Sequence, residues 1–382
     1  MTRGAVDADV VVVGAGPVGL AAAVHARAAG LDVLVVDRRT GTLDKACGEG
    51  LFPGALQAVQ ALGTDPPGHV LAGISYRVAG GHADHRFTGG PGRGVRRTVL
   101  HAALRERAAD VGATFLHGRL TALWQDATGV DVEVVPGRGD DGTGNADGTG
   151  GADGTGGRAP LTLRARWVLG CDGLHSTVRR LAGLEVGPGP RDGLARDRFG
   201  LRRHFQVAPW TDLVEVHWAP HAEAYVTPVA ADTVGVALLG ARATAVAAGA
   251  GFDVYLRSQF PELSARLAAA TSAGPMLGAG PLRRRSRRRS AGRVRLVGDA
   301  SGYVDALTGE GVRVGLAQAE AAVRHLDDAA AYERAWRTAT RDYRALTSGL
   351  LAWASSPARG VIVPAASRAP WLYGAVVERL AR

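Results

Sequence analysis

The sequence predicts an α/β protein with a three-layer, Rossmann-like nucleotide-binding domain, an inserted antiparallel β-sheet and a helical C-terminal region. Three observations lead to this fold class. Residues 8–37 read as strand, helix and strand, and residues 199–239 hold four strand-like segments separated by turn residues. Helical spacing of apolar residues then returns after residue 312. The alternation of these regions predicts a sheet inserted into a nucleotide-binding domain.

The first unit contains an apolar run at Ala8–Val13, an alanine-rich helix over Leu20–Ala29 and a second apolar run at Asp32–Val36. A Gly-x-Gly-x-x-Gly motif lies at the turn between the first strand and the helix. There the first glycine permits a tight bend, the second lets a pyrophosphate approach backbone amides, and the third lets helix and strand pack closely. We therefore predict dinucleotide contacts at Gly14, Ala15, Gly16 and Gly19.

Asp37 stands at the tip of the second strand, where a carboxylate accepts the ribose hydroxyls of a bound adenosine. An acid at this distance favours a nucleotide site over a turn that is merely tight. Arg38 follows in the same turn, and we predict that it also lies at the adenosine. The turn by itself leaves FAD and NAD as alternatives.

The next elements continue the nucleotide-binding domain. Apolar spacing predicts a helix over Thr98–Val111, and alternation predicts strands at Val130–Val135 and Leu161–Leu169. Between these strands, residues 137–157 repeat glycine, aspartate and threonine. That composition buries too little apolar area to offset chain entropy, so we predict a disordered loop.

The inserted sheet and the C-terminal helices follow from periodicity. The predicted strands are Leu201–Val207, Leu213–Trp218, Ala222–Val229 and Thr233–Leu239, and the clearest helices are Val312–Leu326 and Ala330–Leu346. We assign residues 1–75, 98–185 and 286–345 to the nucleotide-binding domain, residues 76–97 and 186–285 to a substrate domain, and residues 346–382 to the C-terminal helical region.

Composition narrows the class of protein. The formal charge of +9 comes almost entirely from arginine, and the densest basic run, Arg283–Arg289, has no interleaved aromatic residues. We therefore expect no nucleic-acid partner, and we expect that run to form a solvated rim or a docking place for a phosphate-bearing cosubstrate. Two cysteines cannot build a disulfide framework or a zinc site, so we expect no metal and a cytoplasmic protein. No apolar stretch reaches the length of a transmembrane segment.

Further motifs carry a family resemblance. The Asp-Gly segment around Asp172 resembles a fingerprint of flavoprotein aromatic hydroxylases, also called class A flavoprotein monooxygenases. The Gly-Asp segment at Asp299, with the Gly-Glu-Gly that follows, resembles a fingerprint that those hydroxylases share with the geranylgeranyl reductase branch. Lys45–Leu51 resembles the reductase segment beside the isoalloxazine, and Arg97 matches an arginine of that branch. His101 departs from the acid usual there.

Membership of this superfamily implies that FAD is the bound cofactor. The resemblance implies FAD contacts from all of these segments, at Ala46, Cys47, Arg97, Asp172, Asp299, Gly309, Gly311 and Val312. Physical reasoning agrees for Asp299, because a carboxylate at the end of a buried strand can accept hydrogen bonds from ribityl hydroxyls. The amides that open the following helix would face the pyrimidine edge of the flavin.

Structural roles compete with these assignments. Asp172 and Asp299 could each cap a turn or a helix. Arg179 could pair with Asp172, for which we favour a mixed structural and cofactor role. Cys47 could be a small core residue, although its glycine-rich loop favours a place beside the flavin.

No second strand-flanked glycine motif occurs, so NAD(P)H is expected to bind transiently as cosubstrate. The resemblance then implies a monooxygenase that uses NAD(P)H and oxygen to hydroxylate an electron-rich small molecule, such as a phenolic polyketide of secondary metabolism. A flavin-dependent alkene reductase similar to geranylgeranyl reductase is the first alternative. A non-catalytic electron-transfer module is the second. A halogenase is disfavoured because its Trp-x-Trp-x-Ile-Pro signature is missing.

The catalytic residues are the least constrained part of the prediction. His204, His217 and Tyr225 lie in strands of the predicted substrate sheet, and a histidine there could deprotonate a phenol. For either histidine alone, a hydrogen-bonded or exposed structural role is favoured. We expect a lipophilic or aromatic substrate and no obligate protein partner. For Leu350–Leu380 we favour packing against the flavin domain over a peripheral membrane face.

Overall fold

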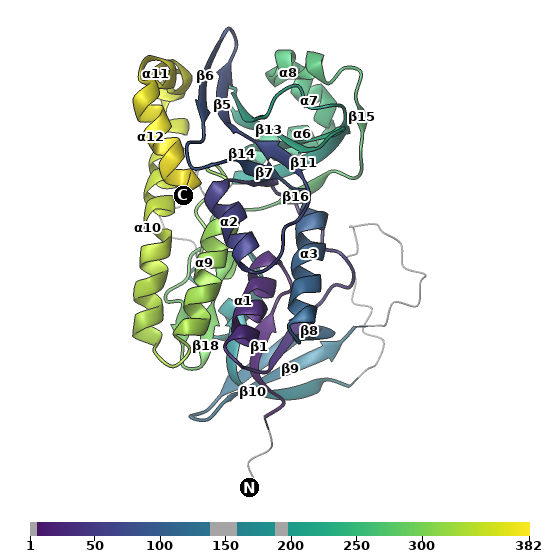
Figure 1. The fold of residues 1–382 in the computed structure, drawn as a ribbon, viewed down its shortest axis with the longest axis vertical. Helices are drawn as coiled ribbons and strands as arrows, with labels where there is room; N and C mark the ends of the chain where they lie inside the picture. The colour runs from purple at the N-terminus through teal and green to yellow at the C-terminus, as the bar shows by residue number, and fades with distance from the viewer. Residues whose placement is uncertain (1–5, 138–158, 188–197) are drawn as a thin grey trace.

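The computed structural model describes residues 6–137, 159–187 and 198–382, and two large sheets dominate it (Figure 1). The predicted disordered loop lies outside the described residues, apart from Gly137. In the first sheet the parallel pairs place β1 between β2 and β10, with β8 beyond β2 and β18 beyond β10. Its strands are β1 (Ala8–Val13), β2 (Val33–Asp37), β8 (Thr114–Gln125), β9 (Val130–Pro136), β10 (Leu161–Gly170), β17 (Ser290–Ala291) and β18 (Val294–Leu296).

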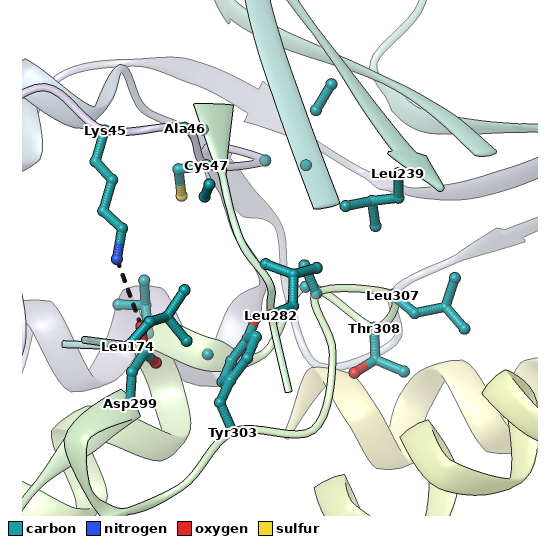
Figure 2. Close-up of a pocket in the computed structure, with 18 of the residues that line it drawn as sticks. Lys45, Ala46, Cys47, Leu174, Leu239, Leu282, Asp299, Tyr303, Leu307 and Thr308 are labelled. Carbon is teal, nitrogen blue, oxygen red and sulfur yellow. Dashed lines mark ion pairs between the residues drawn. The ribbon is translucent and has the colours of Figure 1, made fainter. Parts of the chain in front are cut away.

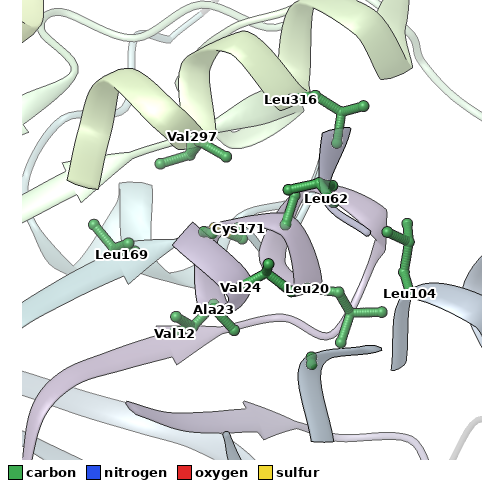
Figure 3. Close-up of a cluster of buried hydrophobic side chains, with 14 of the residues drawn as sticks. Val12, Leu20, Ala23, Val24, Leu62, Leu104, Leu169, Cys171, Val297 and Leu316 are labelled. Carbon is green, nitrogen blue, oxygen red and sulfur yellow. The ribbon is translucent and has the colours of Figure 1, made fainter. Parts of the chain in front are cut away.

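Helices cover one face of this sheet, and the β8–β9 hairpin turns back over the other. Strand β9 pairs antiparallel with both β8 and the first half of β10. The helical layer consists of α1 (Pro17–Ala28), α3 (Arg97–Asp110) and α9 (Gly311–Arg324). Figure 3 shows its packing, in which Val12 of β1, Leu20 of α1 and Leu316 of α9 share one buried cluster. This arrangement confirms the predicted three-layer domain.

The second sheet confirms the predicted antiparallel insertion. The strands pair in the order β15-β11-β14-β13-β12-β5-β6, and β16 adds to β11. Strand β5 pairs in parallel with β12, which brings a segment near residue 75 beside one near residue 215. The strands are β5 (Gly73–Val78), β6 (Gly81–Arg86), β11 (Arg198–Gln206), β12 (Leu213–Trp218), β13 (Ala222–Ala230), β14 (Thr233–Ala241), β15 (Thr271–Ser272) and β16 (Leu277–Ala279).

Three short helices that the sequence analysis did not predict cover one face of the second sheet. Phe252, Leu256 and Leu263 from these helices pack with Val226 and Val236 of the sheet. The helices are α6 (Arg242–Ala250), α7 (Phe252–Gln259) and α8 (Pro261–Arg266). A third, small sheet joins the two parts of the molecule and contains β3 (Gly50–Leu51), β4 (His69–Leu71) and β7 (Gly92–Gly94).

The C-terminal region packs mainly on the second sheet, so the favoured packing against the flavin domain is wrong for most of this segment. Tyr373 and Val377 share a buried cluster with Ile74, Val214 and Val216, and Figure 1 shows α11 and α12 beside β5 and β6. The reason is that these strands leave an apolar face that needs cover. The helices are α10 (Ala329–Ala354), η2 (Pro357–Val361), α11 (Ile362–Arg368) and α12 (Pro370–Ala381).

The remaining described elements are short. They are α2 (Pro53–Ala61), α4 (Thr177–Leu181) and the 3-10 turn η1 (Gly298–Ser301). In the part of the chain that the structure describes, no helix is long and apolar enough to cross a membrane.

Candidate functional site

A cavity of about 910 Å³ extends from the glycine turn after β1 to the C-terminal helices. Segments that are far apart in the sequence converge on it (Figure 2). Of the predicted site residues, Gly14, Gly16, Asp37, Arg38, Ala46, Cys47, Arg97, Asp172, Tyr225, Asp299, Gly309, Gly311 and Val312 line this cavity. Ala15, Gly19, His204 and His217 do not line it.

The glycine turn has the geometry that its motif predicts. Gly14 has a φ of 106°, and a Cβ there would lie 2.6 Å from the carbonyl oxygen of Cys171. A Cβ at Gly19 would overlap the Gly14 carbonyl, so helix α1 can pack closely only with glycine. At Gly16 only the tip of Arg97 lies within 4 Å. The turn therefore leaves its backbone accessible from the cavity.

Asp37 is held at the tip of β2 by backbone amides. Its Oδ2 accepts a 2.7 Å hydrogen bond from the Ala15 amide, and its Oδ1 accepts one of 2.9 Å from the Arg39 amide. The carboxylate thus ties the end of β2 to the glycine turn, and it still lines the cavity. Ala15 contributes through this amide rather than by facing the cavity.

His101 takes the place of the usual acid and supports the same turn. Its Nδ1 accepts a hydrogen bond from the Leu43 amide, so the proton lies on Nε2, which donates to the Ala15 carbonyl at 3.0 Å. Burial lowers the pKa of His101 to about 4, although the bond to Ala15 opposes this shift. A neutral histidine can donate to this carbonyl, whereas an ionised acid cannot.

Arg97 supplies a cation beside the glycine turn. It begins helix α3 and lines the cavity, and its Nη2 lies 3.9 Å from where a Cβ on Gly16 would stand. A guanidinium at this position can pair with an anionic ligand. The accessible turn at Gly16, the N-terminus of α1 and this guanidinium together fit the pyrophosphate of a dinucleotide.

Asp172 is a structural cap that also lines the cavity. It accepts hydrogen bonds from the Ser176 hydroxyl and from the Thr177 and Val178 amides at the start of α4. Burial raises its pKa, and these hydrogen bonds oppose the shift. The suggested pairing with Arg179 is wrong, because that guanidinium donates instead to the carbonyls at 174 and 300. It turns away because the neighbouring amides already satisfy the carboxylate.

Asp299 faces the cavity across from Lys45, whose Nζ lies 3.6 Å from Oδ2 (Figure 2). Its side chain makes no capping hydrogen bond, so the alternative of a helix cap finds no support. The loop that follows turns at Gly309, with a φ of 71°, and opens helix α9 at Gly311. The first residues of α9, Gly311 and Val312, therefore lie at the cavity wall.

Glu310 precedes this helix start and is buried. Burial raises its pKa to about 7, although Arg313 on the next turn opposes the shift. One carboxyl oxygen has no hydrogen-bond partner among the described residues, and the other is paired with Arg313.

The loop that carries Cys47 is clamped to the second sheet through Glu49. Cys47 lies half-buried at the cavity, and its Sγ accepts a hydrogen bond from the Glu49 amide. Glu49 has a φ of 59°, which is costly for a residue with a Cβ. Its buried carboxylate accepts hydrogen bonds from the Arg97 amide at 2.8 Å and from His204 at 2.6 Å. Those contacts hold the strained backbone in place.

The two predicted histidines are hydrogen-bonded strand residues, as the structural alternative proposed. His204 accepts from Arg202 and donates to Glu49, and His217 pairs with Glu215 at 2.9 Å. Tyr225 does line the cavity, but its hydroxyl donates to the Leu307 carbonyl at 2.8 Å, and burial raises its pKa well above the ordinary value.

Sequence reasoning missed several cavity residues. Glu49 stood in a quoted motif, but nothing signalled that it would bind His204. Tyr76 and the apolar side chains of α10–α12 carried no motif at all.

The described residues contain no cluster of three or more His, Cys, Asp or Glu side chains suited to a metal. In the basic run, Arg289 pairs with Glu333 and stacks over Trp336.

Comparison with known proteins identifies the family. Residues 7–343 match the model of the FAD binding domain family, so the chain belongs to that family and FAD is its cofactor. A rifampicin monooxygenase of Rhodococcus hoagii is 32% identical over 196 residues, which are 48% of this chain and 35% of the relative. A menaquinone reductase of Mycobacterium tuberculosis is 40% identical over 133 residues, 32% of each chain. The match thus spans about a third of these curated relatives.

Other relatives match over a greater length. A digeranylgeranylglycerophospholipid reductase of Methanopyrus kandleri is 29% identical over 81% of this chain and 77% of its own. Among solved structures, a flavoprotein/dehydrogenase of Cytophaga hutchinsonii superposes with a TM-score of 0.77, covering 98% of this chain and 92% of that one, at 17% identity. A flavin-dependent brominase superposes with a TM-score of 0.71 at 16% identity, covering 98% and 93%. These two likenesses show the fold.

Proposed function

We propose that the protein is an FAD-dependent monooxygenase that uses NAD(P)H and oxygen to hydroxylate an electron-rich small molecule. The observation that carries this proposal is the continuity of the cavity, which begins at the glycine turn and Asp299 and continues into a chamber walled mostly by apolar side chains. Similarity to a rifampicin monooxygenase and to a tetracenomycin B2 monooxygenase-dioxygenase supports a substrate from secondary metabolism.

The residues that would hold FAD are those that converge on the polar end of the cavity. Arg97 and the amides of α1 would bind the pyrophosphate, Asp37 the ribose of the adenosine, and Asp299 the ribityl hydroxyls. When bound, FAD would supply the redox chemistry that connects NAD(P)H with oxygen. The first amides of α9 would stabilise negative charge at the pyrimidine edge.

The chamber beyond this end would orient the substrate and exclude water. Leu239, Leu282 and Leu307 are among its lining residues (Figure 2). An apolar wall protects a reactive oxidant from hydrolysis and strengthens electrostatic interactions at the flavin. His204 and His217 do not line the cavity, and the Tyr225 hydroxyl donates to the Leu307 carbonyl, so we assign proton removal from the substrate to none of them.

A flavin-dependent alkene reductase is the second candidate. It is favoured by the match over 81% of the chain to a digeranylgeranylglycerophospholipid reductase and by the apolar chamber, which suits a prenyl chain as well as a ring. A non-catalytic electron-transfer module accounts less well for a chamber of this kind beside the cofactor site.

Oxygen uptake distinguishes these functions. The purified, FAD-loaded protein would be mixed with NADPH or NADH under air, with and without phenolic polyketides and prenylated lipids. A monooxygenase would consume oxygen faster with its substrate present and release a hydroxylated product. Saturation of an alkene under anaerobic conditions would establish the reductase instead, and FAD that no nicotinamide donor reduces would leave the electron-transfer module.

A further inference from the structure

The end of the cavity farthest from the glycine turn is an apolar annex, which we define as the space between β5, β12 and the C-terminal helices. The β5 and β12 wall presents Ile74, Val214 and Val216, and these strands place no charged side chain on the lining. The opposite wall is also uncharged and comes from α10, α11 and α12, including Leu350, Trp353, Ile362, Ala366, Leu372 and Val376. A space of this composition favours a hydrocarbon over a polar ligand.

The annex contains one polar group suited to a ligand. Tyr76 lines the cavity with its ring between those of Trp218 and Tyr373, at centroid distances of 5.4 and 5.0 Å. Its hydroxyl makes no hydrogen bond within residues 6–137, 159–187 and 198–382. Burial raises its pKa above the ordinary value, so the hydroxyl keeps its proton. A fixed phenol donor that lines an apolar space can donate to an oxygen of a ligand bound there.

The annex also reaches the surface. Trp353 and Leu372 line the cavity and are still 38% and 51% exposed, and Trp371 beside them is 76% exposed. A ligand could therefore enter here without passing the glycine turn. The matched family segment ends at residue 343, before Leu346 and the rest of the helical wall. The helical wall of the annex thus lies mostly outside the matched segment, whereas the wall of β5 and β12 lies inside it.

We propose that this annex binds an extended hydrocarbon chain of the substrate while Tyr76 donates a hydrogen bond to an oxygen at the head of that chain. The inference rests on the proposed function, because it describes the substrate of the same cavity. It narrows the substrate to an oxygenated ring or head group with a long alkyl or prenyl tail. A polyketide without such a tail would leave the annex unfilled.

The test measures binding without turnover. The oxidised, FAD-loaded protein would be titrated anaerobically, without NAD(P)H, with 4-alkylphenols from 4-methylphenol to 4-decylphenol and with the matching alkylbenzenes. Flavin absorbance or tryptophan fluorescence would report the dissociation constant. We expect that constant to fall about fourfold for each added methylene until the annex is full, because each buried methylene contributes a similar free energy.

Two variants that change the volume of the annex in opposite directions test whether the alkyl tail binds there. Ala366→Phe reduces the space in the annex, so the gain in affinity per methylene should stop at a shorter alkyl chain. Leu350→Ala enlarges it, so the gain should continue to a longer one. Ala330→Phe, at an exposed site on the same helix α10, should leave the profile unchanged. If Ala366→Phe does not fold, Leu350→Ala decides the question alone.

A third variant tests the head. Tyr76→Phe should weaken every phenol about fivefold, the effect of one hydrogen bond, and should leave the alkylbenzenes unaffected. A dissociation constant that does not depend on chain length in the wild type would contradict the proposal that the annex binds the tail. Equal effects of Tyr76→Phe on phenols and alkylbenzenes would contradict the role of Tyr76. Binding that follows the expected profile without any substrate-stimulated oxygen uptake would reject the monooxygenase and leave the annex standing.

Discussion

The two ends of the cavity are built in different ways. At the polar end, backbone conformation makes the site, because the turn at Gly14 and Gly16 lines the cavity and Asp37 is held by two backbone amides. At the annex, side chains make the site, and they come from two strands and three helices that are distant in sequence. A backbone site fails when one residue changes, whereas a side-chain wall changes gradually with volume.

This difference predicts its largest effect at Gly14. Gly14→Ala should lower the free energy of unfolding by about 4 kcal/mol and abolish FAD binding, because left-handed strain adds to the overlap with the Cys171 carbonyl. Gly30→Ala is the matched control. Gly30 also has a positive φ, of 78°, but a Cβ there meets nothing within 4 Å, so only about 1 kcal/mol should be lost.

Urea unfolding and the ratio of FAD to protein after purification measure both variants. Equal losses of stability for Gly14→Ala and Gly30→Ala would show that strain alone matters. Retained FAD in Gly14→Ala would show that the turn does not bind the cofactor.

The clamp between the two ends should give the next largest effect. His204→Ala leaves the buried Glu49 carboxylate without its 2.6 Å partner. This variant should lower the free energy of unfolding by about 3 kcal/mol. His217→Ala is the control, because Glu215 keeps hydrogen bonds or ion pairs with Trp210, Arg77 and Arg266. His217→Ala should lower the free energy of unfolding by only about 1 kcal/mol.

Chemical denaturation gives these free energies, and steady-state kinetics checks the mechanism. A structural clamp predicts that the pH profile of kcat/KM keeps its shape in His204→Ala. Loss of one limb of that profile would instead make His204 the base that deprotonates the substrate.

The same contrast explains how far the sequence could predict the molecule. The strand at Ala8–Val13, the glycine turn and the helix after Glu310 follow from local spacing, and the structure has each of them. The helices α6–α8 and the covering of β5 by α12 were missed because partners distant in sequence decide them. Neither the bond from Glu49 to His204 nor the place of Tyr76 has a local signal, since each depends on the packing of two sheets.

The polar end should also be sensitive to acid through His101. Its pKa of about 4 in the folded protein lies below the ordinary 6.5, so between these values the unfolded chain binds a proton that the folded protein does not. Stability is therefore lost as the pH falls from about 6.5 to about 4, by about 2 kcal/mol at pH 5 and about 3 kcal/mol in all. His101→Gln removes this dependence. Urea unfolding at pH 7.5 and pH 5 measures it, and parallel pH profiles for both proteins would contradict the neutral, buried histidine.

The smallest effect is expected where the two ends meet, at Tyr225. Its hydroxyl donates to the Leu307 carbonyl in the loop before Gly309, so Tyr225→Phe should lower the free energy of unfolding by about 1 kcal/mol. Tyr255→Phe on α7 is the control, because the Tyr255 hydroxyl makes no hydrogen bond in the described part of the chain.

The kinetics of Tyr225→Phe separate positioning from catalysis. Burial keeps the hydroxyl protonated, so it cannot act as a base near neutral pH, and kcat should change less than about threefold. A small shift of the flavin absorbance would show that the loop at Leu307 has moved relative to the cofactor. A loss of kcat of about a hundredfold or more with unchanged stability would instead place this hydroxyl in the reaction, and the polar character of the cavity would then extend past the flavin toward the annex.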